Sequence, residues 1–562
     1  MRDAASAALQ QGLSPMNSDH AAPESRLRHR ARQYVANGLL DAAQVTLEAL
    51  LEQEPGDGHA RMDLVDVLLR RGQLHAATHQ LLRLATMDVL DVRLMVQAVR
   101  RLYFNGEILA ARACLDRLEL VSNPSAAMLA ELAQLRWMLG ELPAAKAWMD
   151  RAIEAGIQTP DACYLQAMLA QFTGDTRRAR DVLEASLRRW PGFGDAAVAL
   201  ANARRQTARA NDLDLLYEQL GQLPAGGRSV EVMAARASFE SALFKELDDL
   251  GRHEEAWQAL ARSNALMHAV SPYDATGEAA VTDAILRAAE TLAATRVAVP
   301  PAFDGPTPIF IVGLPRSGTT LLDRMLSNHS QVASAGEIND FRRQLRWMTD
   351  VPPSGVAGMV LAQQRSTKLD FAELGARYLR QTQWRAQGRR FYVDKLPINI
   401  RMVHLIRRAL PHAPILHMVR EPMDVCFSNL KAMLGPASAY SYDMQALAHY
   451  YDLYARLAEH WHASMPGAML DVPYDALVSD PAATLHRVLE YCRLHDEEAC
   501  LFPESNASPV ATPSSVQVRE PIHTRALGEW RHYAKQLEPL RLALGDRARL
   551  LRRERLPHAG GG

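Results

Sequence analysis

The apolar residues in the first half of the chain follow a helical pattern that repeats every 34 residues. The repeat is marked by glycines, each followed five residues later by an alanine: Gly38, Gly72, Gly106, Gly140 and Gly174, with Ala43, Ala77, Ala111, Ala145 and Ala179. A glycine ends one helix and lets the chain reverse, and a small alanine lets the next helix approach closely. The spacing predicts an all-α superhelix of stacked helix pairs over residues 25–296, preceded by a flexible N-terminus at residues 1–24.

The array becomes less regular toward its end. Gly251 repeats the local pattern but lies 77 residues after Gly174, where two periods would give 68. We therefore expect an insertion, at residues 211–228. The 34-residue period resembles the tetratricopeptide repeat, and such an array offers a concave groove for a protein or peptide partner. A dimerisation surface, and so a homodimer, is the alternative.

In the second half, short apolar runs alternate with helical stretches. A proline-rich linker at residues 297–307 separates the two halves. The apolar runs predict buried strands at 309–312, 331–337, 390–395, 414–420 and 468–472. Strands that alternate with helices predict an α/β P-loop-like domain with a central parallel sheet over residues 308–550, followed by a flexible tail at 551–562.

The loop after the first of these strands has the makeup of an anion-binding site. Gly313-x-x-x-x-Gly318 has the spacing of a nucleoside-triphosphate P-loop, and a helix follows it. Thr319 stands where a P-loop ATPase has its phosphate-binding lysine, so a triphosphate with Mg²⁺ is the less natural ligand. Arg316 adds a fixed positive charge, and Ser317 and Thr320 add hydroxyl donors. The loop therefore favours a smaller phosphate-bearing group.

Three charged residues stand at or next to the predicted carboxyl ends of other strands. They are Glu337, Lys395 and Arg420. Ligands of parallel α/β sheets bind at these strand ends. We therefore expect the three side chains to lie around the anion loop.

Composition and charge exclude several other classes of function. The formal net charge of −1 gives no field that favours nucleic acid, and no apolar run approaches the ~18 residues needed to span a membrane. The five cysteines are scattered, odd in number and without a CxxC pair, so neither a disulfide framework nor a zinc site is indicated. A reduced compartment fits best, and we expect a cytoplasmic protein.

Four separated motifs resemble those of the sulfotransferases that use PAPS (3′-phosphoadenosine 5′-phosphosulfate). They are Pro-Arg-Ser-Gly-Thr-Thr at 315–320, Gly-Glu at 336–337, Asp-Lys-x-Pro at 394–397 and Val-Arg-Glu-Pro-x-Asp-Val-x-x-Ser at 419–428. The resemblance covers about residues 306–545. It is closest to the protein-tyrosine sulfotransferases and to bacterial enzymes that join tetratricopeptide repeats to a sulfotransferase domain. It implies sulfuryl transfer from PAPS to an acceptor hydroxyl, with PAP as product and no metal.

The resemblance also implies a role for each matching residue. Glu337 would be the general base, and Lys395 would stabilise the leaving oxygen. The residues implied to hold the 5′-phosphosulfate are those of the loop: Arg316, Ser317, Gly318, Thr319 and Thr320. The pair implied to hold the 3′-phosphate is Arg420 and Ser428. Tyr474 would lie near the nucleotide, and Arg519 of the 514–530 segment would also contact it.

Two departures from the family pattern remove positive charge. Ala432 stands where the tyrosine-type enzymes have an arginine, and Glu529-Trp530 stands in place of a Lys-Trp pair. The candidates to replace this charge are Arg519, Arg525 and Arg531.

Alternatives stay open for the acceptor and for single residues. The acceptor is a protein tyrosine delivered by the repeats, or a carbohydrate or small molecule. A P-loop kinase or ATPase and a non-catalytic scaffold are the other function classes. Lys395 pairing only with Asp394 or another acid is the structural alternative to its catalytic role. His329 and His417 are alternative bases, although we expect each to be structural.

Overall fold

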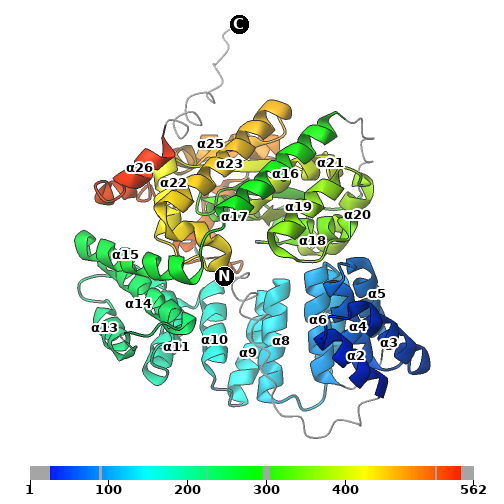
Figure 1. Ribbon diagram of the computed structural model, residues 1–562. Helices are drawn as coiled ribbons and strands as arrows, with labels where there is room; N and C mark the ends of the chain where they lie inside the picture. The colour runs from blue at the N-terminus through cyan, green and yellow to red at the C-terminus, as the bar shows by residue number, and fades with distance from the viewer. Residues whose placement is uncertain (1–25, 88–90, 225, 295–303, 513–514, 546–562) are drawn as a thin grey trace.

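A computed structural model describes residues 26–87, 91–224, 226–294, 304–512 and 515–545. The predicted N-terminal segment at 1–24, most of the linker (297–303) and the predicted tail at 551–562 lie outside the described residues. The first half forms an arc of paired helices, and the second half forms a unit that lies against this arc (Figure 1).

Five helix pairs carry the 34-residue repeat. They are α2 (Arg26–Ala36) with α3 (Leu40–Gln53), α4 (Gly58–Arg70) with α5 (Leu74–Thr86), α6 (Val92–Asn105) with α7 (Ile108–Leu118), α8 (Ala126–Leu139) with α9 (Leu142–Glu154), and α10 (Pro160–Phe172) with α11 (Thr176–Arg189). The turn glycine of each pair has a φ between 73° and 97°, which favours glycine. The alanine five residues later is fully buried in every pair. The predicted repeat superhelix is confirmed.

The later part of the array departs from this regularity. It contains α12 (Gly194–Asn202), α13 (Leu213–Gln222), α14 (Val230–Asp249) and α15 (His253–Val270). Residues 203–212 connect α12 to α13, where the earlier pairs have turns of two or three residues. The extra length therefore lies mostly in this connection, and α13 occupies much of the expected insertion at 211–228.

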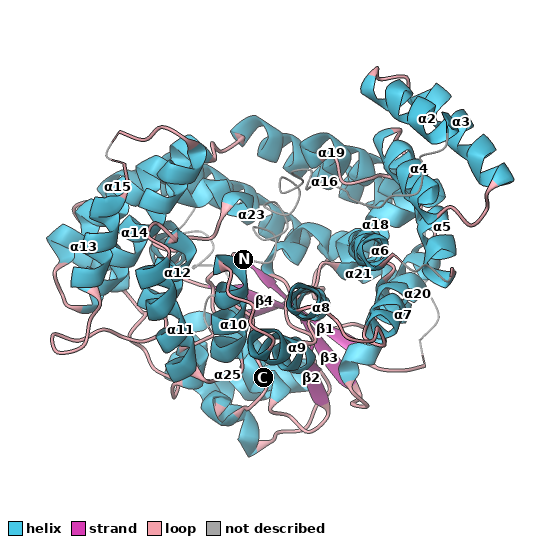
Figure 2. Cartoon of the chain, turned by 90° about the horizontal axis from the view of Figure 1, so that it is seen from below, coloured by secondary structure: helices cyan, strands magenta, loops and turns pink. Residues whose placement is uncertain are grey.

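Five parallel strands form the sheet of the second half, in the order β2-β3-β1-β4-β5. Their bounds are β1 (Thr307–Gly313), β2 (Val332–Ser334), β3 (Phe391–Lys395), β4 (Ile415–Val419) and β5 (Leu470–Pro473). The predicted central parallel sheet is confirmed. Figure 2 shows the strands in the centre of the molecule with helices around them.

Helices connect the strands and cover the sheet. They are α17 (Thr319–Ser327), α18 (Asp340–Thr349), α19 (Gly355–Ser366), α20 (Phe371–Thr382), α21 (Val403–Ala409), α22 (Pro422–Leu430), α23 (Met444–Ser464), α24 (Tyr474–Ser479), α25 (Pro481–Tyr491) and α26 (Glu538–Leu544). Short 3₁₀ helices include η1 (Gln383–Ala386), η2 (Pro397–Met402), η3 (Pro436–Tyr442), η6 (Gln517–Arg519) and η7 (Glu529–Tyr533).

The central strand β1 is buried on both faces. Phe310 packs edge-on against Phe341 of α18, with ring centroids 6.2 Å apart. Its neighbours Ile309 and Ile311 belong to the core on the opposite face, together with Leu322 of α17. Alternate residues of a strand point to opposite faces, so an apolar run without polar breaks is what a doubly covered strand requires.

The last helix of the predicted array packs against the second half. Helix α16 (Ala275–Ala293) lies beside α19 and α23 (Figure 1). Glu278 forms an ion pair with Arg401 of η2, and Asp283 accepts from Arg456 of α23 at 3.1 Å. This helix is thus an arm of the first half that covers the second.

The two halves also meet along the carboxyl ends of the first helices of three pairs. Arg346 of α18 donates to the carbonyl of Phe104 at 3.3 Å, and Arg385 of η1 donates to Leu139 at 2.8 Å. Arg519 donates to the carbonyl of Phe172 at 2.8 Å. The last carbonyls of a helix have no partner within the helix and carry the negative end of its dipole, so cations stabilise them. We call these three arginines the capping arginines.

Candidate active site

The anion loop is held in shape by two glycines that nothing larger could replace. At Gly313, a Cβ atom would lie 2.7 Å from the carbonyl oxygen of Met418 on β4. Gly318 has a φ of 101° and begins α17; a Cβ there would lie 2.4 Å from the ring of Tyr474. The backbone therefore passes close to β4 and to Tyr474 before it enters α17, and a helix N-terminus offers amide donors to an anion.

The side chains of the loop add donors to this cradle. Ser317 is 1% exposed, and its hydroxyl has no hydrogen-bond partner within the described residues. Thr319 and Thr320 are buried at the first turn of α17. Arg316 has a φ of 66°, a conformation uncommon for any residue other than glycine. A buried unsatisfied hydroxyl beside a helix N-terminus is what a bound anion would complete.

Arg420, at the end of β4, joins the loop to the rest of the site. It donates to the carbonyl of Arg316 at 3.0 Å and to the carbonyl of Ala526 at 2.7 Å. Its guanidinium lies 4.7 Å from the centre of the Tyr474 ring. Ser428 is buried on α22, two turns further along the chain. The structure thus brings Arg316, Arg420 and Tyr474 together, as the sequence predicts.

Two positive charges are held next to each other in this group. Burial and the neighbouring Arg420 lower the pKa of Arg316, and nearby acidic groups oppose this only in part. Burial likewise raises the pKa of Tyr474, against the effect of the two arginines. The two positive charges repel each other and are only partly balanced by the nearby acidic groups, so this pair of arginines is suited to a polyanionic ligand.

Glu337 and Lys395 form an ion pair beside the loop. Their Oε1 and Nζ atoms lie 2.5 Å apart, with the lysine side chain fully buried and the glutamate 32% exposed. Behind the lysine, Asp323 of α17 accepts from the Ser334 hydroxyl at 3.0 Å. Burial raises the pKa of Asp323 to about 6, although the charge of Lys395 partly lowers it. The lysine therefore has a partly exposed carboxylate on one side and a buried carboxyl group nearby.

Asp394 precedes Lys395 but serves another purpose. It accepts from the Tyr378 hydroxyl at 2.7 Å and from the Asn399 amide at 3.3 Å. Burial raises the pKa of Asp394 well above its usual value. The acidic partner of Lys395 is therefore Glu337 rather than Asp394.

The structure places Arg519 at the repeats. It is one of the capping arginines. A Cβ atom placed on Gly174 would lie 3.3 Å from its Nη1 atom, so the guanidinium packs closely against this turn glycine. Arg525 pairs with Glu520, and Arg531 lies over the ring of Trp530 at 5.7 Å. Part of the 514–530 segment does reach the site, because Ala526 accepts from Arg420 and the Gly528 amide donates to Asp424 at 2.9 Å.

Lys431 and Glu529 form a pair that the sequence did not reveal. The ammonium of Lys431, just beyond α22, bonds to the Glu529 carboxylate. Burial would raise the pKa of Glu529, but the charges of Lys431, Arg420 and Arg316 lower it. Lys431 therefore brings a positive charge close to the arginines. The signal available was its place directly before Ala432, where the family pattern has its arginine.

The two histidines considered as bases are held in structural contacts. His329 is fully buried; its Nδ1 accepts from the Gln331 amide at 3.0 Å, and its Nε2 lies 3.1 Å from the His495 carbonyl. His417 contacts Asp471 and Tyr454 behind the loop.

Models of two protein families match this sequence. The model described as "Sulfotransferase family" matches residues 308–498, and the model described as "Tetratricopeptide repeat" matches residues 29–88 and 96–160. The C-terminal half thus carries a sulfotransferase-family domain, and the N-terminal half carries tetratricopeptide repeats.

Curated relatives match the C-terminal half. An uncharacterized protein of Aquifex aeolicus is 30% identical over 243 residues, which is 42% of this chain and 31% of that protein. Protein-tyrosine sulfotransferase 2 of Gallus gallus is 26% identical over 235 residues, 40% of this chain and 62% of the relative. The match spans less than two thirds of the length of either protein.

Solved structures are similar to each half. The sulfotransferase domain from the Synechococcus PCC 7002 olefin synthase is 22% identical, with a TM-score of 0.33, over 47% of this chain and 100% of that one. A tetratricopeptide repeat protein from Parabacteroides merdae is 15% identical, with a TM-score of 0.31, over 43% of this chain and 91% of that one. With scores this low, neither structure bears on function.

Proposed function

We propose that this protein, with a sulfotransferase-family domain behind tetratricopeptide repeats, moves a sulfuryl group from PAPS to an acceptor hydroxyl. The observation that carries the proposal is the juxtaposition of a glycine cradle containing the unsatisfied Ser317 hydroxyl with the Glu337–Lys395 pair. The glycine cradle suits the binding of a phosphosulfate, and the Glu337–Lys395 pair suits proton transfer beside it. The cradle residues Arg316 to Thr320 are proposed for the 5′-phosphosulfate, and Arg420, Ser428 and Tyr474 for the 3′-phosphate end.

The proposed reaction is an in-line displacement at sulfur. The acceptor oxygen forms a bond to sulfur while the bond from sulfur to the bridging oxygen of PAPS breaks, so PAP leaves with the electron pair. Glu337 takes the acceptor proton, and Lys395 stabilises the negative charge on the leaving oxygen. An ammonium has three donors, so Lys395 can hold the Glu337 carboxylate and the leaving oxygen together. These residues supply the acid–base and charge chemistry that the transfer needs.

The acceptor proposed is a protein tyrosine, presented by a peptide or protein bound to the repeats. The support is the curated tyrosine-type relative and the repeat arc that lies against the transferase half (Figure 1). A carbohydrate or small molecule is the alternative acceptor. None of the described helices meets the length and apolarity needed to cross a bilayer. We propose a cytoplasmic location on the scattered cysteines, all five of which are unpaired thiols.

Calorimetric titration with PAP in the absence of magnesium, alongside ATP, tests the donor. We expect tight PAP binding and weak or no ATP binding, because the loop has no lysine for a γ-phosphate. ATP binding that requires magnesium, without PAP binding, would move the function to the kinase class.

The same titration tests the assignment of Arg420. Arg420→Ala should weaken PAP at least tenfold more than it weakens adenosine 5′-phosphosulfate, which lacks the 3′-phosphate, since a charge-assisted contact contributes roughly 1.5–3 kcal/mol. Equal losses for both ligands would remove Arg420 from the 3′-phosphate. Arg525→Ala, which removes an exposed arginine paired with Glu520, is the matched control.

A further inference from the structure

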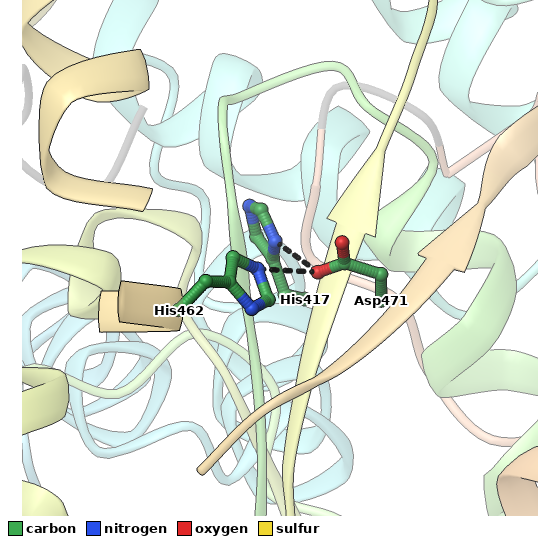
Figure 3. Close-up of side chains that lie close together, drawn as sticks. All are labelled: His417, His462 and Asp471. Carbon is green, nitrogen blue, oxygen red and sulfur yellow. Dashed lines mark hydrogen bonds and ion pairs between the residues drawn. The ribbon is translucent and has the colours of Figure 1, made fainter. Parts of the chain in front are cut away.

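Three side chains from three elements converge on one point behind the anion loop. His417 lies on β4, His462 on α23 and Asp471 on β5 (Figure 3). Asp471 Oδ1 lies 2.8 Å from His417 Nδ1 and 3.0 Å from His462 Nε2. One potential ligand atom from each residue lies within 4.8 Å of the other two. Two imidazoles and a carboxylate that face a common point are a donor set for a transition-metal ion.

Tyr454 of α23 orients the buried member of this group. Its hydroxyl lies 2.7 Å from His417 Nε2, on the far side of the ring from Asp471. A hydroxyl can donate or accept, so His417 can hold its proton on Nε2 and keep this contact. Nδ1 then presents a lone pair toward His462 and Asp471. A second partner that fixes the tautomer of a histidine is the usual companion of a metal-ligating imidazole.

The three side chains differ in how far solvent reaches them. The His417 side chain is 1% exposed, whereas Asp471 is 17% and His462 is 29% exposed. An ion could therefore enter from the side of His462 and keep a water in its remaining coordination position. Tetrahedral bonds of ~2.1 Å place ligand atoms roughly 3.4 Å apart. The present 2.8 and 3.0 Å separations would need to widen by about half an ångström, which small side-chain rotations supply.

We propose that His417, His462 and Asp471 bind one zinc-like divalent ion that ties β4, β5 and α23 together. The ion's role is structural, because none of the three side chains belongs to the proposed transfer site. His417 pairs in register with Val312, the residue before the glycine that opens the anion loop. A bound ion would thus brace the strand pair from which the loop and Arg420 emerge. Magnesium and calcium are excluded by their preference for oxygen ligands.

The competing explanation is a plain hydrogen-bond network. A carboxylate oxygen can accept from two neutral imidazoles, which would satisfy both histidines without an ion. The two explanations differ in a measurable way. The network predicts no saturable site that depends on His462, whereas the ion site predicts one of unit stoichiometry.

Calorimetric titration of the full, chelator-treated chain with Zn²⁺ decides between them, with Mg²⁺ as the negative control. We expect one saturable Zn²⁺ site and a higher melting temperature when it is filled. His462→Ala should weaken that site at least tenfold, since it removes one of three ligands. His462 is partly exposed, so this variant is expected to fold, and its circular dichroism verifies that.

His486→Ala is the matched control, because His486 also bonds to an aspartate, Asp496, at 2.7 Å but on the surface. It should leave the zinc site unchanged. Zinc binding that is absent, or that weakens equally in both histidine variants, would overturn the proposal and leave the hydrogen-bond network. Because this test uses no nucleotide, its result is independent of the proposed sulfuryl transfer.

Discussion

The contact between Glu337 and Lys395 determines which substitution tests the proposed base. Lys395 is fully buried, so a change that leaves its ammonium without a partner would destabilise the fold as well as the chemistry. Glu337→Gln keeps an oxygen acceptor for the lysine but cannot take a proton. We expect turnover to fall by about 10²–10⁴, the usual contribution of a general base, with PAP affinity nearly unchanged.

The measurement is PAP release from PAPS with the best acceptor from a screen of tyrosine peptides, sugars and phenols. Glu538→Gln is the control, since Glu538 also pairs with a cation, Arg541, but on the surface. Full turnover in Glu337→Gln would remove Glu337 from the mechanism.

Asp323 gives the fold a dependence on pH. Its pKa is about 6 when folded, against ~3.9 in an unfolded chain, so the folded state binds the proton more tightly. The stability it contributes is fully present below about pH 4 and is lost as the pH rises through 6. Asp323→Asn, which can still accept from Ser334, should therefore be more stable than the parent at pH 7 by roughly 2–3 kcal/mol.

Urea denaturation of both proteins at pH 4 and pH 7 checks this. The difference in unfolding free energy should shrink to about 0.5 kcal/mol at the lower pH. An unchanged gap at both values would mean that Asp323 is not the group that titrates.

At the scale of elements, substitutions at two turn glycines distinguish the stability lost from a strained turn from the stability lost at the contact between the two halves. Gly72 and Gly106 have φ values of 79° and 88°. A Cβ at Gly72 would meet nothing within 4 Å, whereas at Gly106 it would lie 2.8 Å from Gln344 and 3.1 Å from Arg343 of α18. Gln344 cannot easily move away, because it is buried and bonds to the Gly106 carbonyl and to Arg377.

Gly72→Ala should cost only the left-handed conformation, about 1–2 kcal/mol. Gly106→Ala should cost this plus roughly 1–3 kcal/mol for the displaced contact with α18. Denaturant melts of both variants measure the difference. Equal losses would show that the repeat turn does not support α18.

Elements with a strong pattern could be predicted from the sequence, and contacts between the halves could not. The conformations of the turn glycines and of the apolar run of β1 are determined by the local sequence, so they could be predicted from it. Glu337 and Lys395 converge because parallel strands end at one edge. The acceptor of Arg519 is a main-chain carbonyl of Phe172, which no side-chain pattern marks. Lys431 and Glu529 pair across 98 residues of sequence, so their contact depends on the tertiary fold.

At the scale of the whole molecule, the two halves share a core. One cluster of buried residues runs from the later repeats into the sheet domain, and Tyr533 is part of the junction. The ring centroid of this fully buried tyrosine lies 6.3 Å from that of Phe244 on α14 and 5.2 Å from that of Phe427 on α22. Its hydroxyl donates to Asp248 at 2.6 Å. The early repeats belong to a second cluster.

Native-state hydrogen exchange should reflect this division. The amides of α14 and of β1 are expected to open with the same free energy, because they belong to one core. The amides of α2 and α3, at the end of the other cluster, should open at a lower free energy. Exchange in α14 that follows α2 and α3 would show that the halves unfold independently.

The capping arginines bear on how this protein can vary between species. Each binds a main-chain oxygen, and every amino acid offers the same oxygen at that place in a helix. Substitutions of exposed side chains on these helices therefore leave the three carbonyl contacts intact, so the outward surface of the repeats can change without loss of this part of the attachment. A change in length has a larger effect, because the three carbonyls lie on successive helix pairs, and any gain or loss of residues between α6 and α10 would move them relative to their arginines. The repeats can thus diversify by point mutation on their exposed surface, or by whole units added at the N-terminal end of the array, while the second half stays attached.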